Sequence, residues 1–501
     1  MKYWYTLIAL LLIFSSCEDT LDLQAPSELT ANGFWESENG ARAAQTGLYG
    51  TLRGRAFTLW QLGSLRSDVW GGRTFESADD LTLIESNINI SNAPFGGWAG
   101  MYTAIHRVND FIVNVPDIEF VDATDKDHVL GQAYGLRAFY YYTLLKTWGA
   151  VPLTTEPLAT TEPEGLSKAR ASEQEVMDQI KSDLETSLTY FGDDASFWTG
   201  SRNYWSKAAT LALKGDVFIW SGNLLGGGEA DFREAKQALE EVSTLDVALV
   251  DNFADLWTIS NENNKEFIFA IAYEQDQATN FYSIMTGRST EINPQFDSYG
   301  NSMSDYIVNG ANRYGPSDKT LMLGNDTLDS RMDVSFIRLY TDSNEGMGYD
   351  QFTPEKYFGA VQNKFSGSIN GSVRIMDNDV PVYRYADVLL LLAEAKTRLG
   401  EDPSEEINAV RMRAYGDNYD ADDMGYSNGN EDENIEAILQ ERYKEFLLEG
   451  KRWWDLRRAG DQYVFDNVEF LEPGEEYLLK LPITLDMIGR NPLLEQTQGY
   501  R

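Results

Sequence analysis

Residue types that support enzyme catalysis are scarce in this sequence. The two histidines, His106 and His128, fall on separate predicted helices and lack the spacing of a metal-binding pair. We interpret His106 as a partly buried structural residue. No nucleophile elbow, HExxH motif, phosphate-binding loop or dinucleotide fingerprint is present. A paired-carboxylate glycosidase stays open, because 79 acidic residues provide many pairs and none stands out. We nevertheless predict that the protein is not an enzyme.

The single cysteine, Cys17, follows a stretch typical of a secretory signal. Lys2 gives the start a positive charge, residues 3–14 are mostly apolar, and Ser15 and Ser16 precede the cysteine. The apolar run is too short to cross a bilayer as a helix. Cleavage before a cysteine that follows small residues is typical of bacterial lipoproteins, in which the thiol is acylated. Phe14, where such signals usually have Leu, departs from that pattern.

These features predict three parts. A signal peptide covers residues 1–16, a lipidated tether covers residues 17–40, and the folded body covers residues 41–501. No later apolar run is long enough to cross a membrane, so we expect the mature protein to be anchored by lipid rather than to span. With one cysteine used for lipid, an intramolecular disulfide and a thiol nucleophile are both excluded.

One acidic stretch comes close to a calcium-binding loop. From Asp420, acidic residues occupy the first and third positions of an EF-hand, with Gly425 at the sixth and Glu431 at the twelfth. Met424 stands at the fifth position and cannot bind calcium through oxygen. We therefore predict a solvated acidic loop, and we predict no metal and no cofactor for the protein.

The positive evidence for function lies in two long irregular insertions, about residues 66–97 and 274–327. Both are dense in Asn, Ser, Gly and aromatic residues, and aromatic-rich loops of this length are usually functional. Sugars stack their C–H faces on aromatic rings, while amide and guanidinium groups bind hydroxyls. The predicted ligand-binding residues are Trp70, Arg73, Phe75, Phe281, Tyr282, Tyr299 and Tyr306, with Trp70 and Arg73 the preferred pair. For each ring, packing on the scaffold is the competing interpretation.

The glycan-binding hypothesis requires the predicted rings to be exposed to solvent. If Trp70 is an exposed loop ring, its truncation should weaken glycan binding and leave stability almost unchanged. Trp98 and Trp257, by contrast, are interpreted as core residues, because their spacing matches the inner face of an element. We expect the buried Trp453 to contribute several kcal/mol to stability, as large core side chains do.

The charge balance restricts the partners. Lys and Arg total 41 against 79 Asp and Glu, which gives a formal net charge of −38. Such a surface repels nucleic acid and anionic headgroups, because binding to phosphates requires cationic side chains. We therefore expect no nucleic-acid partner, and contact with the membrane only through the lipid.

The elements that position the loops are predicted to be helices, which makes the fold class all-α. Apolar residues recur at three- and four-residue spacing over 41–52, 101–113, 128–149 and 172–191. Residues 206–244 and 384–414 each read as two helices that cross at small residues, at roughly the 34-residue tetratricopeptide (TPR) period. A final helix, 433–449, is expected to end with Gly450 as its C-cap.

Seven segments in order resemble one known family. They read CEDTLDLQAP, WAGMYTAIHRVND, AYGLRAFYYYTLLKTWGAVPL, DSRMDVSFIRLY, VPVYRYADVLLLLAEAKTRLG, ERYKEFLLEGKRWWDLRRAG and YLLKLPITLDMIGRNPLLEQTQGY. Together with the lipoprotein signal, they resemble the SusD/RagB family of surface nutrient-binding lipoproteins from Bacteroidetes. The resemblance covers nearly everything after Cys17.

The resemblance implies an all-α fold on four TPR-like helix pairs, with ligand loops displayed on one side. It also implies exposure on the outer membrane, for which the acidic Glu18 and Asp19 are suitable, and a SusC-like TonB-dependent transporter as partner. The implied ligand is an oligosaccharide or polysaccharide. Two alternatives stay open at this point: a TPR-type or SusD-like scaffold that binds peptide, and a surface glycoside hydrolase.

The lipoprotein hypothesis makes a direct prediction. Cys17→Ala should prevent acylation, because no other thiol is available, and should move the protein from the membrane fraction to the soluble fraction. Fractionation with and without detergent measures this. A variant that still needs detergent would show that Cys17 is not the anchor.

Overall fold

The computed structural model describes residues 34–75, 81–158, 166–343 and 357–500. The expected signal peptide, Cys17 and most of the tether therefore lie outside the described residues. The fold is mostly helical, which confirms the predicted class, and four small two-stranded antiparallel sheets supplement the helices. Within the described ranges, no helix is both long enough and apolar enough to cross a membrane.

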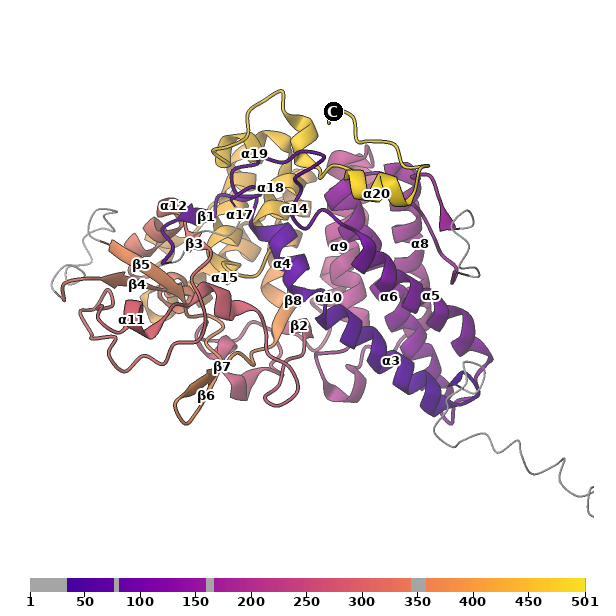
Figure 1. Ribbon diagram of the computed structural model, residues 1–501, viewed down its shortest axis with the longest axis horizontal. Helices are drawn as coiled ribbons and strands as arrows, with labels where there is room; N and C mark the ends of the chain where they lie inside the picture. The colour runs from indigo at the N-terminus through magenta and orange to yellow at the C-terminus, as the bar shows by residue number, and fades with distance from the viewer. Residues whose placement is uncertain (1–33, 76–80, 159–165, 344–356, 501) are drawn as a thin grey trace, which may run out of the picture.

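Figure 1 shows the helices in two groups, with the irregular segments and most strands on the side of the second group. The helices of the first group are α3 (Glu38–Arg53), α4 (Ala56–Ser64), α5 (Ala99–Asn114), α6 (Ala123–Trp148), α8 (Glu173–Phe191), α9 (Lys207–Leu224) and α10 (Gly228–Val242). Those of the second group are α14 (Tyr385–Arg398), α15 (Ser404–Tyr415), α17 (Glu431–Glu445), α18 (Arg452–Ala459) and α19 (Asp461–Asn467), whereas α20 (Leu485–Arg490) lies beside the first group near α8. Short helices in the connecting segments are α11 (Ser289–Ile292), α12 (Asp318–Met322), α13 (Arg331–Ser335) and α16 (Ala421–Met424).

Local sequence signals start and orient these helices. Ser172 caps α8 by accepting a hydrogen bond from the Glu175 amide, and the Glu175 carboxylate accepts one from the Ser172 amide. This reciprocal arrangement satisfies two amides that the helix itself cannot. The stripe that includes Val176, Ile180 and Leu184 is completely buried against the core. The helix therefore forms where its cap and periodicity predict.

Small residues let the paired helices approach closely, as the TPR-like pattern predicts. A Cβ atom at Gly215 of α9 would lie 2.5 Å from Leu239 of α10, and one at Gly222 would lie 2.4 Å from Phe232. Helix α10 also packs against α14. The two predicted pairs thus stand side by side although residues 243–384 separate them in sequence.

The strands are β1 (Trp70–Gly72), β2 (Phe267–Ile271), β3 (Gly315–Pro316), β4 (Phe336–Tyr340), β5 (Tyr357–Gln362), β6 (Ser368–Asn370), β7 (Val373–Ile375) and β8 (Val380–Arg384). They pair as β1–β3, β2–β8, β4–β5 and β6–β7. The first pair connects the two predicted insertions, because Trp70 lies opposite Pro316 and Gly72 opposite Gly315. The second pair returns the chain from the irregular region to α14.

One predicted helix end is wrong. Helix α17 ends at Glu445, before the expected C-cap at Gly450, and Leu448 adopts a left-handed backbone conformation with φ of 71°. The reason is that this turn directs its carbonyl groups to distant donors. The Leu448 carbonyl accepts hydrogen bonds from the Trp60 indole (2.8 Å) and the Tyr282 hydroxyl (2.7 Å). A continued helix would use these carbonyls internally.

A buried ion cluster lies at the junction between this turn and the irregular segments. We call it the Glu445 cluster, and its members are Glu266, Arg331, Lys364, Arg384, Arg413, Glu441, Glu445 and Glu449. Four cations face four carboxylates, and every side chain in it is at most 3% exposed. The members come from β8, α13, α15, α17 and the turns beside β2, β5 and α17.

The contacts in the cluster are multiple and short. Arg384 lies 3.0 Å from Glu445 and 2.8 Å from Glu449. Arg331 lies 2.6 Å from Glu441, and Arg413 lies 2.8 Å from Glu266. Burial by itself raises the pKa of Glu445, but the neighbouring arginines outweigh it and lower that pKa well below its usual value. Glu445 is therefore charged, and its charge depends on these partners.

This dependence gives a prediction for stability. Glu445→Gln keeps the size of the side chain but leaves buried guanidinium groups uncompensated, so the free energy of unfolding should fall by about 3–5 kcal/mol. Urea denaturation measures the change. Glu436→Gln, on the exposed face of the same helix, is the matched control and should change stability little. Equal effects of the two substitutions would contradict the role given to the cluster.

Candidate functional site

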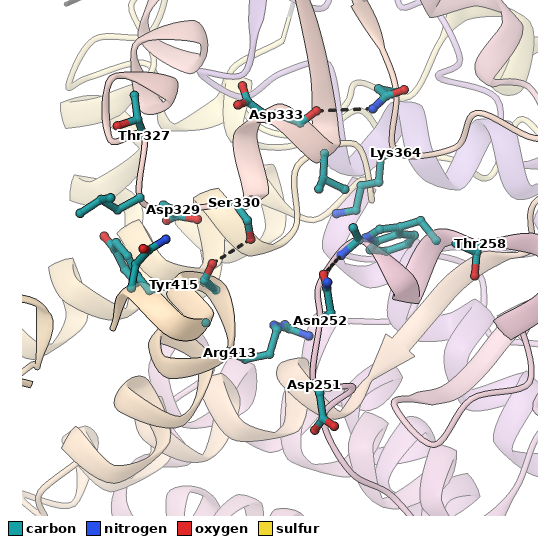
Figure 2. A pocket seen from close by; sticks show the side chains of 18 of the residues that line it. Asp251, Asn252, Thr258, Thr327, Asp329, Ser330, Asp333, Lys364, Arg413 and Tyr415 are labelled. Carbon is teal, nitrogen blue, oxygen red and sulfur yellow. Dashed lines mark hydrogen bonds between the residues drawn. The ribbon is translucent and has the colours of Figure 1, made fainter. Parts of the chain in front are cut away.

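A pocket of about 900 Å³ opens among the irregular segments. We call it the Tyr415 pocket (Figure 2), and its lining comes from within residues 251–259, 327–334, 363–367 and 413–418, together with Tyr299. Figure 2 shows Tyr415 and Thr327 on one side of it and Thr258 on the other. This volume lies in the range of ligand sites for molecules of oligosaccharide size.

Tyr299 is presented by a tight turn. The Asp297 carboxylate accepts hydrogen bonds from the amides of Tyr299 (2.9 Å) and Asn301 (2.8 Å), and Gly300 takes up the positive φ that the turn requires. The Tyr299 hydroxyl donates to Asp333 of α13. The ring is 51% exposed, so it is oriented by its hydroxyl while much of its surface remains accessible.

Tyr415 is the last residue of α15, where Gly416 with φ of 54° stops the helix. Its hydroxyl donates to Asp326. Burial, reinforced by the Asp326 charge, raises the pKa of the Tyr415 hydroxyl, which therefore stays protonated. Both tyrosines are thus fixed through a hydroxyl–carboxylate bond and belong to different segments of the pocket wall.

Two members of the Glu445 cluster, Lys364 and Arg413, form the inner wall of the pocket. The Lys364 ammonium donates to the carbonyls of Glu445 (3.1 Å) and Leu447 (3.0 Å) and to the Glu449 carboxylate (2.6 Å). Burial lowers the pKa of Lys364 to about 8, against the opposing effect of Glu449. These cations fix the inner wall through their bonds to the Glu445 cluster.

The remaining polar side chains of the pocket are carboxylates, amides and hydroxyls. Although burial raises the pKa of Asp329, the adjacent Arg331 and Lys444 bring it well below the usual value. Asp251 and Asp417 are exposed, and neither forms an ion pair within the described part of the chain. Asn252 and Asn418 provide amide groups beside them. Rings, amides and carboxylates are the groups that bind sugar hydroxyls and C–H faces.

The wall around Thr258 is supported by Glu262 and Asp379, two carboxyl groups whose pKa values are raised. The Glu262 carboxylate accepts a hydrogen bond from the Asp379 amide (2.8 Å), and the Asp379 carboxylate accepts one from the Tyr273 amide (2.8 Å). Burial, and then repulsion by Asp379, raises the pKa of Glu262 to about 8. Burial also raises the pKa of Asp379 to about 6. This pair connects the wall to the β2–β8 sheet.

A second pocket, of about 550 Å³, contains the pair of residues that the sequence favoured. We call it the Arg73 pocket, and it is lined from within residues 67–73, 81–85, 317–319 and 467–470, together with Tyr357. Arg73 is exposed and donates to the Tyr357 carbonyl (2.7 Å). Trp70 contributes only an edge, because it is 4% exposed. The structure therefore brings Trp70 and Arg73 together, but away from Tyr299.

The expected exposure of Trp70 and Tyr282 is wrong. The Trp70 indole donates to the Ser64 hydroxyl (2.7 Å), and its ring packs edge-on against Trp60 at 5.4 Å. Tyr282 is completely buried and stacks on Phe365 with 3.9 Å between ring centroids. Both rings are covered by packing contacts in the core, and Trp70 is held there by the pairing of its strand with a distant one. Neither ring therefore has an accessible face on which a sugar could stack.

The other predicted rings are partly buried against the scaffold. Phe75 stacks on Phe358 at 5.2 Å, and Phe281 lies 5.2 Å from Phe57. The Arg374 guanidinium lies 4.8 Å from the centroid of the Tyr306 ring. Of the predicted ligand-binding residues, only Tyr299 lines the Tyr415 pocket. Its contact with a ligand stays a prediction.

Tyr415, Asn252 and Ser330 were missed as site residues. Tyr415 directly follows the predicted helical segment 384–414 and precedes a glycine, which indicates a helix end but not a pocket. Asn252 and Ser330 lie outside or at the edge of the predicted insertions.

Trp98 (8% exposed), Trp257 (7%) and Trp453 (0%) are buried, which confirms their interpretation as core residues. Trp257 also lines the Tyr415 pocket.

The acidic stretch at Asp420 forms a short helix instead of a metal loop. The Asp420 side chain accepts a hydrogen bond from the Asp422 amide and so caps α16. Across the described residues, no three His, Cys, Asp or Glu side chains are arranged to hold a metal ion.

Comparison with known proteins agrees with this architecture. The sequence profile of the SusD family matches residues 265–500, and the profile described as "Starch-binding associating with outer membrane" matches residues 20–213. The fold is similar to that of NanU from B. fragilis, with 34% identity, a TM-score of 0.85 and coverage of 96% of this chain and 100% of that one. The chain belongs to the SusD family.

Further SusD relatives cover the chain almost completely. A SusD superfamily protein of Bacteroides vulgatus is 34% identical, with a TM-score of 0.84 over 93% of this chain and 100% of that chain. SusD-like protein P38 of Formosa agariphila is 27% identical over 97% of this chain and 96% of its own. SusD family members are glycan-binding proteins associated with the outer membrane, and they are not catalysts. The hydrolase alternative is therefore set aside.

The buried position of Trp70 reverses the expectation for its truncation. Trp70→Ala should lower the free energy of unfolding by roughly 3–5 kcal/mol, because it opens a cavity among packed rings. Chemical denaturation measures this, and Arg73→Ala, an exposed neighbour in the same pocket, should have a much smaller effect. Native stability in Trp70→Ala would contradict the buried placement.

Proposed function

We propose that this SusD family protein captures an oligosaccharide or polysaccharide in the Tyr415 pocket and delivers it to a SusC-like TonB-dependent transporter of the outer membrane. The protein would be exposed at the cell surface, attached through lipid on Cys17. The observation that carries the ligand assignment is a pocket of about 900 Å³ with two oriented tyrosine rings among amide and carboxylate groups.

Preorganisation supports the choice of this pocket. The Tyr299 ring is already fixed by Asp333, and the Tyr415 ring by Asp326, so binding need not immobilise them. Ligands that meet fixed groups lose less affinity to ordering. The Arg73 pocket is the competing site, since Phe470 provides it with a ring that is 46% exposed.

Binding on a panel of neutral glycans tests the proposal. Affinity gels with starch, laminarin, xylan and galactomannan, followed by calorimetry, should identify a bound glycan. Tyr299→Ala should then weaken binding roughly fivefold, because one stacked ring contributes about 1 kcal/mol. The melting temperature should change little, since the ring is half exposed.

Matched variants locate the site. Tyr299→Phe removes only the hydroxyl and should retain part of the affinity, while Phe470→Ala should bind like the native protein. Loss of binding in Phe470→Ala alone would move the site to the Arg73 pocket. Binding of peptides in place of every glycan would overturn the glycan assignment and favour the peptide-binding alternative.

A further inference from the structure

We propose that the Tyr415 pocket selects sugars by charge: it accepts uncharged or amine-bearing sugars and excludes those that carry carboxylate or sulfate groups. This inference rests on the proposed function, because it concerns the ligand of the same pocket. Three observations carry it, and they concern the cations of the lining, their hydrogen-bond partners and the free carboxylates.

The first cation, Lys364, has no donor left for a ligand. An ammonium group has three hydrogen-bond donors. The three acceptors within reach of Lys364 are the Glu445 carbonyl, the Leu447 carbonyl and the Glu449 carboxylate. The side chain is 0% exposed, and its charge is matched by that of Glu449.

The second cation, Arg413, is also buried and ion-paired. Its terminal nitrogens donate to Glu266 and Glu445, and its side chain is 3% exposed. The remaining nitrogen, Nε, is buried and has no acceptor in the described part of the chain. Both cations are therefore buried in the wall of the pocket, and each is ion-paired with carboxylates of the Glu445 cluster.

The accessible charges of the pocket are negative. Asp251 and Asp417 are exposed and have no cationic partner among the described residues. Asp333 accepts the Tyr299 hydroxyl and lies 3.6 Å from Arg338, which itself is nearly buried. A carboxylate or sulfate on the sugar would be repelled by these groups, and the described residues of the lining include no exposed cation to offset that repulsion, whereas hydroxyl and ammonium groups would donate hydrogen bonds to them.

A ligand-independent experiment measures the charge of the pocket. In the mature chain with Cys17→Ala, Thr258→Cys places a thiol in the lining and Ser91→Cys places one on a remote exposed turn. Each reacts with a cationic (trimethylammonium) and an anionic (sulfonate) methanethiosulfonate of similar size. The cation-to-anion rate ratio should be several-fold higher in the pocket than at the remote site, because the exposed carboxylates attract the cationic reagent and repel the anionic one.

Neutralising the carboxylates is the matched test. The double substitution Asp251→Asn and Asp417→Asn should lower the cation-to-anion rate ratio at Thr258→Cys almost to the value at Ser91→Cys. The ratio at Ser91→Cys itself should not change. High salt should also reduce the difference between the rate ratios at the two thiols, because it screens the carboxylates. Equal ratios at the two sites, or an excess that survives both substitutions, would overturn the proposal.

Pairs of glycans that differ only in charge extend the test to ligands. Starch and laminarin are each compared with derivatives whose primary alcohols are oxidised to carboxylates, and chitosan oligomers with their N-acetylated forms. The oxidised forms should bind several-fold more weakly than their parents, and the double asparagine variant should narrow that gap. If no glycan binds while the thiol ratios hold, the proposed function fails and the charge assignment stands. Tighter binding of an oxidised form would overturn charge selection while leaving glycan binding intact.

Discussion

The Glu445 cluster is the interaction on which the arrangement of the irregular half depends. Buried charges are tolerated only when each one is paired and hydrogen-bonded, and loss of a single partner leaves the others uncompensated. Here the partners come from the ends of β8 and α17, from α13 and α15, and from the turns beside β2 and β5. None of these segments can shift alone without breaking a buried pair. The cluster thus holds the irregular segments against the helical array.

The pocket takes its shape from this constraint. Lys364 and Arg413 belong both to the cluster and to the pocket wall, and Asp329 pairs with Arg331 of the same cluster. The apolar core alone could not set the positions of these irregular segments, since packing between loops is less specific than a set of directed hydrogen bonds. The groups that we propose to bind ligand stand in front of the cluster, where they can vary without disturbing the charges behind them.

Much of the helical array could be predicted from the sequence, because caps and apolar spacing act over a few residues. Ser172 with Glu175, and the small residues between α9 and α10, are local signals of this kind. The pocket could not be predicted, because five separate segments of the chain build it. Arg384 and Glu445 are 61 residues apart in sequence, and a charged residue does not reveal its partner. Trp70 is a similar case. It is buried because its strand pairs opposite Pro316, and the local sequence does not reveal that pairing.

The β1–β3 pairing also has a consequence for the order of folding. Trp70 cannot acquire its strand partner until Pro316 has been made, and the Glu445 cluster cannot close before α17 exists. Contacts between residues so distant in sequence form late, since a long loop must first be closed. Helix pairs such as α9 and α10 need only near neighbours. We therefore expect the helical array to form early and the face that carries the Tyr415 pocket to assemble last, as a single cooperative step that requires nearly the whole polypeptide.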